Sequence, residues 1–289
     1  IGLLVATGGI TLGLTADRKS PLDFVPAGVD AVGRISIRES IEALGLADEL
    51  RRRADPVDLG FDPTRDVEAV WFAARLPRDD SLPSGLVLVE GTFDPARIIR
   101  VDAPAPIERA RSGATTRTAV HRGTIYAVIR PADEKLPSIA IACLLEGLIA
   151  IGTEEMVERA IDAGQGRAPS VLEEPGLSEV LGKVRPGSLA WAAVRSPGRV
   201  PAPLEGLRFA LAEAQVSGRS VSLRATARFD GADQAERVLP LLQTPLELLD
   251  GAAAEGIVLA RSARALGPEV ELDVRLDAER IRAALAHRD

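Results

Sequence analysis

The residues most able to do chemistry gather in one acidic segment, "DPVDLGFDPTRDVEAV", at residues 55–70. A row of carboxylates could hold calcium, but the spacing departs from the D-x-[DN]-x-[DN]-G loop, and two prolines fix the backbone differently. The pattern favours a turn that is ordered by aspartate caps and by an ion pair between Arg65 and one of the acids. The carboxylates of the segment are Asp55, Asp58, Asp62, Asp66 and Glu68.

A carboxylate-dependent hydrolase is the enzymatic alternative, and it needs a histidine beside this segment. It predicts that Asp62, Asp66 or Glu68 lies within about 6 Å of His121 in a cleft. The chain has two histidines and one cysteine, which gives no zinc-type spacing, and it has no G-x-S-x-G motif. We therefore assign no catalytic, cofactor-binding or metal-binding residue and expect no cofactor. Asp62, Arg65, Asp66, Glu68 and His121 remain candidate surface residues.

A second segment with the form of a functional site is "IAIGTEEMVERAIDAG", residues 149–164, which reads as a strand, a glycine turn and a helix. Such corners bind phosphate in many enzymes. Here Thr153 fits the N-cap, and Glu154 and Glu155 occupy the first turn, where they would repel a phosphate. The chain has neither G-x-G-x-x-G nor G-x-x-x-x-G-K-[ST]. We expect no phosphate site at this corner. By the same reasoning, Asp94, Asp230 and Asp277 are expected to cap helices rather than to act in catalysis.

The composition limits the class of partner. The formal net charge is −7, and aromatic residues make up only 3% of the chain. An acidic surface repels phosphate backbones and anionic lipid headgroups, so binding of nucleic acid or of a membrane through basic patches is disfavoured. The expected partner is a protein or a small molecule of unknown identity.

The N-terminal run "IGLLVATGGITLGL" has no charged residue in 14 positions. Its length and composition fit the apolar region of a signal peptide or part of a membrane anchor. We interpret residues 1–16 as an export or anchor segment and residues 17–26 as a linker, with membrane contact only through the first. This predicts an extracytoplasmic location, periplasmic or membrane-anchored. The alternative is an edge strand of a cytoplasmic domain.

The remaining chain alternates hairpins with helices. We expect helices over residues 38–54 and 231–251, the second interrupted near Pro240 and Pro245. Residues 117–130 predict a hairpin that turns at Arg122–Gly123, and residues 137–152 predict another that turns near Glu146–Gly147. This pattern predicts an α+β fold, with antiparallel sheets, helices on one face and an internal duplication. The expected halves are residues 27–168 and 169–289, either separate or continuous. A doubly wound α/β fold is the alternative.

Four phrases together resemble an uncharacterised group of bacterial exported or membrane-tethered proteins of unknown function. They are "GFDPTRDVEAVWFA", "VLVEGTFD", "RGTIYAV" and "LIAIGTEEMVERAIDAGQG". The resemblance covers about residues 24–195 and implies a location outside the cytoplasmic membrane, with no assigned enzyme activity. The resulting hypothesis is a non-enzymatic, envelope-associated domain with a binding or structural role. The hydrolase and a soluble intracellular binding module are the alternatives.

Overall fold

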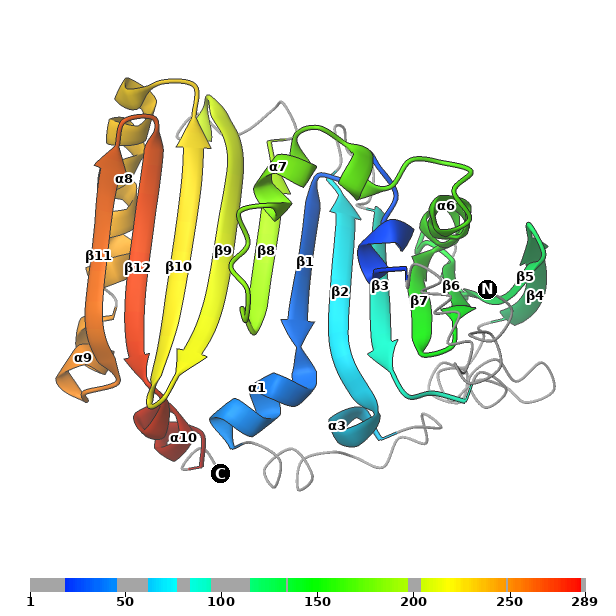
Figure 1. Cartoon of the computed structure of the whole chain (residues 1–289), viewed down its shortest axis with the longest axis horizontal. Helices are drawn as coiled ribbons and strands as arrows, with labels where there is room; N and C mark the ends of the chain where they lie inside the picture. Colours follow the sequence, from blue (N-terminus) through cyan, green and yellow to red (C-terminus); the bar gives the residue numbers. More distant parts are fainter. Residues whose placement is uncertain are drawn as a thin grey trace, which may run out of the picture.

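The computed structural model describes residues 19–45, 62–76, 84–94, 115–133, 135–196, 204–247 and 249–286. These residues form a single twelve-stranded sheet in which neighbouring strands are antiparallel (Figure 1). The strands, in order across the sheet, are β11 (Val258–Leu266), β12 (Glu269–Asp277), β10 (Ser220–Phe229), β9 (Leu207–Ser217), β8 (Ala190–Arg195), β1 (Ala31–Ser36), β2 (Val67–Arg75), β3 (Ser84–Gly91), β7 (Leu148–Thr153), β6 (Ile139–Leu145), β5 (Thr124–Arg130) and β4 (Thr115–His121).

The helices are short except for two, α6 and α8. The described helices are α1 (Ile37–Leu44), α3 (Pro63–Asp66), α6 (Glu154–Gly164), α7 (Leu177–Leu181), α8 (Ala232–Glu247), α9 (Asp250–Ala254) and α10 (Ala278–Ala286), with the 3-10 helices η1 (Pro21–Phe24) and η2 (Val171–Glu173).

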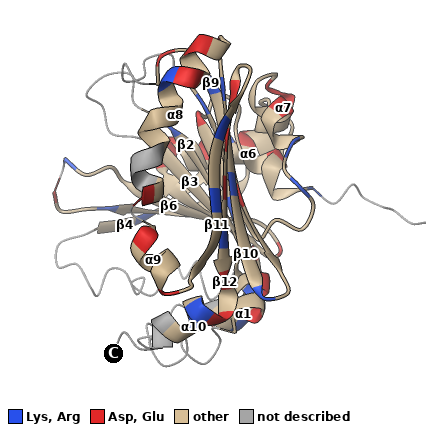
Figure 2. Cartoon of the chain, turned by 90° about the vertical axis from the view of Figure 1, so that its left-hand side faces the viewer, with Lys and Arg blue, Asp and Glu red and all other residues tan. Residues whose placement is uncertain are grey.

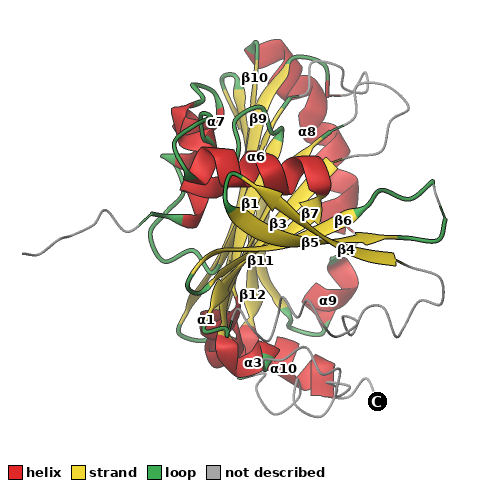
Figure 3. Cartoon of the chain, turned by 90° about the vertical axis from the view of Figure 1, so that its right-hand side faces the viewer, coloured by secondary structure: helices red, strands yellow, loops and turns green. Residues whose placement is uncertain are grey.

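The two faces of the sheet carry different helices, as Figures 2 and 3 show. We call one the α6 face: α6, α7, η1 and η2 lie over it, and Trp71 and Trp191 belong to its core. The other is the α8 face, where α8 packs on Phe229 and Val270. The prediction of several α+β sheets with helices on one face is therefore wrong. The described residues form one large antiparallel sheet with few helices, and the two longest of these helices, α6 and α8, lie on opposite faces.

The pattern of cross-strand neighbours explains this arrangement. One row of paired residues on the α6 face is apolar across the strands from β4 to β2. It continues with Arg34 and Trp191 and is polar or charged from Glu213 onward, so α6 packs on the first part of the row, over β3, β7 and β6. From β4 to β11, this row reads Ala119, Tyr126, Ala142, Ala150, Leu88, Trp71, Arg34, Trp191, Glu213, Arg224, Asp273 and Ser262.

The sheet also crosses the expected boundary between residues 168 and 169. Strands β1 and β8, from either side of it, pair directly, with Arg34 opposite Trp191. A buried ionic contact reinforces this junction. Asp30 is 1% exposed, accepts a hydrogen bond from the Leu76 amide at 2.9 Å and lies 3.4 Å from Nη2 of Arg195 on β8. Arg195 also pairs with Glu174, which follows η2.

The predicted positions of the two hairpin turns agree with the structure, unlike the predicted arrangement of the sheet. The turn at Arg122 and Gly123 has φ values of 51° and 84°, the left-handed conformation that a two-residue hairpin turn requires. Gly147 likewise has a φ of 78° in the second hairpin. Two helix predictions need correction. The helix expected over residues 38–54 ends at Leu44, because Gly45 adopts a left-handed C-cap with φ of 63°. Helix α8 continues through residue 240, where an interruption was expected.

Candidate ligand-binding site

The described part of the acidic segment, residues 62–70, begins with a closed turn at the start of β2. The Asp62 carboxylate accepts hydrogen bonds from the Thr64 hydroxyl at 2.7 Å and the Thr64 amide at 2.9 Å, and these bonds lower the pKa of Asp62. The Asp66 carboxylate accepts a bond from the Asp62 amide at 2.8 Å. Asp62 is therefore the N-cap of α3, as the turn interpretation predicts. Asp55 and Asp58 lie outside the described residues.

The other charged residues of the segment form exposed ion pairs. Nε of Arg65 lies 3.3 Å from Asp66, and the Arg65 side chain is 83% exposed. Glu68 pairs with Arg38 at 3.2 Å. Within the described ranges, no group of three or more acidic, histidine or cysteine side chains is arranged to hold a metal ion.

His121 lies at a different place in the fold. Strand β4 is at one edge of the sheet, five strand positions from β2. The His121 ring contacts carboxylates of α6: Nε2 is 3.0 Å from Asp162, and Nδ1 is 3.8 Å from Glu158. The structure does not bring His121 to the acidic segment, so the hydrolase alternative gains no shared site from the geometry.

Helix α6 is held to the β4–β5 hairpin by further polar contacts. The buried hydroxyl of Tyr126 donates a hydrogen bond to Glu158 at 2.6 Å. Burial of the phenol, followed by this bond, raises the pKa of Tyr126. Glu154 pairs with Arg117, and Glu155 lies 3.5 Å from Arg75. The acids of the first helical turn are thus bound to cations of this chain.

The capping predictions had mixed outcomes. Asp277 accepts bonds from the amides of Arg280 at 3.0 Å and Glu279 at 2.8 Å, which lower its pKa. Asp230 pairs with Arg208, and no cap bond of its side chain is observed within the described part of the chain. Thr153 has the backbone of an N-cap, but its hydroxyl makes no capping hydrogen bond. The helix that Asp94 was expected to cap lies outside the described residues.

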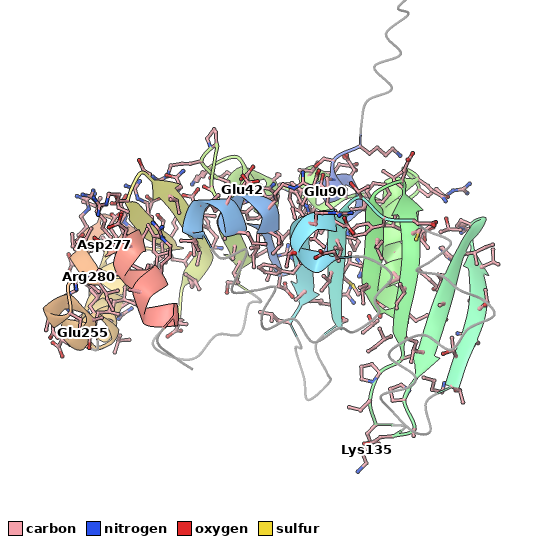
Figure 4. The ribbon with its side chains drawn as sticks, turned by 90° about the horizontal axis from the view of Figure 1, so that it is seen from below. Glu42, Glu90, Lys135, Glu255, Asp277 and Arg280 are labelled. Atoms are coloured by element: carbon pink, nitrogen blue, oxygen red, sulfur yellow. The ribbon has the colours of Figure 1, made fainter. Side chains whose placement is uncertain are left out.

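The most distinctive surface is on the α8 face. A second row of paired residues crosses all twelve strands and contains one polar side chain, a threonine at the edge. From β4 to β11, it reads Thr118, Ala127, Ile141, Ile151, Val87, Phe72, Gly33, Ala192, Ala212, Ala225, Leu272 and Ala263. The sheet curves so that both of its edges bend toward this face, which makes the face concave (Figure 4).

A hollow of about 350 Å³ lies in the middle of this face, and we call it the alanine trough. Its floor spans β8, β9 and part of β10, and larger side chains border it. Ile35 is 40% exposed on one side, and Leu223 is 39% exposed on the other. The residues that line it are Ile35, Phe72, Ala190, Trp191, Ala192, Ala212, Glu213, Ala214, Leu223, Arg224, Ala225 and Leu272.

Two residues of the lining, Glu213 and Arg224, are charged, but their side chains point to the opposite face of the sheet. Side chains of successive residues on a strand alternate between the two faces. Glu213 accepts hydrogen bonds on the α6 side from the Arg185 amide at 2.7 Å and the Ser188 hydroxyl at 3.0 Å. Arg224 pairs there with Asp273 at 2.9 Å. The trough is therefore an apolar surface to which these ionisable groups add no charge.

The sequence does contain a signal for this surface. Alanine occupies positions 190 and 192 in "AWAAV" and positions 210, 212 and 214 in "ALAEA", so each segment carries small residues on one face. When all residues on one face of a strand are small, we expect a ligand or another part of the backbone to approach that face closely. The signal becomes readable only once β8 and β9 are known to be neighbours in register, with Ala192 opposite Ala212.

Comparisons with known proteins identify a fold and no family. No protein-family model matches the chain, and none of the curated protein sequences matches it. Within the described ranges, no helix combines the length and apolar character needed to cross a membrane. The chain is similar to solved structures of TP0453. Crystal form IV superposes with a TM-score of 0.52 at 11% identity, covering 94% of this chain and 98% of that one. Crystal form III gives 0.52 at 10% identity, covering 93% and 99%. At this level of identity, the similarity shows that the two proteins share an overall fold.

Proposed function

We propose that this chain is a non-enzymatic, envelope-associated binding domain, and that it holds an aliphatic ligand of the lipid class in the alanine trough. The observation that carries the proposal is the trough itself. Its volume of about 350 Å³ falls within the range of small-molecule sites, and side chains that border it are exposed although they are apolar.

The physical chemistry of the lining selects the ligand class. Because the surface offers apolar contact and little else, affinity must come from removing aliphatic groups from water. Each buried methylene contributes about 0.8 kcal/mol, so roughly ten methylenes contribute on the order of 8 kcal/mol before the entropic cost of association. The polar end of such a ligand would remain in solvent. A charged or strongly hydrogen-bonding ligand would lose its hydration without compensation.

The envelope location rests on separate support. The uncharged N-terminal run and the resemblance to exported or membrane-tethered proteins both favour export. Protease digestion of intact cells, spheroplasts and lysed cells tests it: we expect cleavage in intact cells or on removal of the outer barrier. Protection until lysis would contradict the proposed location.

The binding proposal is tested by native mass spectrometry with hexadecanoic acid. The unmodified chain should gain the mass of one fatty acid. Ala212 is exposed on the trough floor, so Ala212→Phe fills the trough without overpacking the core and should weaken binding at least tenfold. Thr226→Phe is the matched control, because Thr226 lies on β10 directly after the trough residue Ala225 and faces the other side. Equal binding by both variants, or none by the unmodified chain, would refute the proposal.

A further inference from the structure

Phe72 is the aromatic side chain that borders the alanine trough on the β2 side. It is half-buried, and its ring lies directly over Gly33 of β1. A Cβ atom at Gly33 would sit 2.1 Å from Cζ of Phe72 and 2.6 Å from the Trp191 carbonyl oxygen. The missing side chain at Gly33 therefore allows the ring to lie against the backbone of β1, where it forms a wall.

The apolar surface continues on the other side of this wall. Val87 of β3, 36% exposed, is the direct neighbour of Phe72, and Ile151 and Ile141 extend the same row across β7 and β6. Yet the trough has no lining residue from β3, β7 or β6. Phe72 therefore separates two apolar stretches of one concave face.

We infer that Phe72 is a specificity-determining residue that restricts the trough to one aliphatic chain and keeps a second chain from the β3–β7–β6 side. This inference rests on the proposed function. The argument is geometric. The ring occupies the position between the two stretches, and with alanine in its place the surface would run without a barrier from Ala192 to Val87. A two-chain lipid could then lie with one chain on each side of β1.

The test compares a one-chain and a two-chain probe. Native mass spectrometry measures binding of hexadecanoic acid and of dipalmitoyl phosphatidylglycerol to the unmodified chain and to Phe72→Ala. We expect Phe72→Ala to bind the two-chain probe about tenfold more tightly than the unmodified chain does, the change expected for burial of two more methylenes. Phe72 lines the trough, so hexadecanoic acid should bind Phe72→Ala more weakly than the unmodified chain, and the ratio of two-chain to one-chain affinity should rise.

The outcomes separate the two proposals. If neither protein binds hexadecanoic acid, the proposed function fails. If both bind it and Phe72→Ala shows no gain for the two-chain probe, the binding function stands and the role of Phe72 is refuted. Circular dichroism checks the fold of each variant. Phe72→Leu, which retains part of the wall, should show a smaller gain, and it decides the question if the alanine variant does not fold.

Discussion

Replacement of Asp30 by alanine should destabilise the junction between β1 and β8. The carboxylate is 1% exposed and accepts a hydrogen bond from the Leu76 amide at 2.9 Å. Loss of this acceptor leaves a partly buried N–H without a partner, which costs about 1–3 kcal/mol. Arg195 loses one of two carboxylate partners but keeps Glu174, so this loss adds about 1 kcal/mol or less. The expected decrease in the free energy of unfolding is about 1–4 kcal/mol.

Equilibrium unfolding in urea, followed by circular dichroism, measures this decrease. The midpoint should fall without a change in the slope, because the folded state buries the same surface. Asp30→Asn keeps an acceptor for the Leu76 amide and should lose less. Asp273→Ala is the control: its pair with Arg224 is 2.9 Å long but both side chains are more than a third exposed, so its loss should stay below about 1 kcal/mol. Equal losses for Asp30→Ala and Asp273→Ala would refute the reasoning.

Three further predictions follow from individual side chains. Tyr126 is the single tyrosine, and its burial and its bond to Glu158 raise its pKa above 10.0. The neutral phenol therefore stabilises the fold below about pH 10, and this stabilisation decreases as the pH rises further. Tyrosinate absorbance should appear only as the chain unfolds. The pKa of Asp277 is lowered from 3.8, so its cap contributes its full stabilisation above that value. The difference in urea midpoint between the unmodified chain and Asp277→Ala should shrink below pH 3.8 and vanish once the pH has fallen through the lowered pKa. Burial raises the pKa of the Cys143 thiol, so this single cysteine should react with a thiol reagent more slowly in the folded chain than in urea, and equal rates would contradict its placement.

Features set by neighbouring residues could be predicted from the sequence. The turn at Arg122–Gly123 and the cap at Asp62 depend on a few adjacent residues whose conformational preferences are strong. The end of α1 at Gly45 was also readable, because a glycine that can adopt the left-handed conformation commonly ends a helix. The apolar residues Leu46 and Leu50, which continue the helical spacing after the glycine, instead favour a longer helix.

Features set by long-range pairing could not be predicted. Strand β9 carries Phe209 and Leu211 toward one face and Ala210 and Ala212 toward the other, so its own pattern does not say which face a helix covers. That depends on the neighbours β8 and β10, which are fixed by register across the whole sheet. The same reasoning applies to His121, whose acidic partners lie on α6, about 40 residues away in sequence.

The candidate site also combines features that neighbouring residues determine with features that only strand pairing determines. In the described part of the acidic segment, residues 62–70, the charged side chains contact other residues of this chain, as Asp62 contacts Thr64 and Glu68 contacts Arg38. The floor of the alanine trough consists mainly of alanines, whose side chains have no ionisable or hydrogen-bonding group. These alanines form a binding surface only because strand pairing aligns Ala190, Ala192 and their neighbours into one exposed hollow.

A crystal structure of the chain with hexadecanoic acid brominated at its terminal carbon tests the central claim most directly. The proposal predicts an anomalous bromine peak in the alanine trough, in van der Waals contact with Ala212 or Ala192 on the α8 face. A peak on the α6 face, or an empty trough at a saturating concentration of the probe, would contradict it.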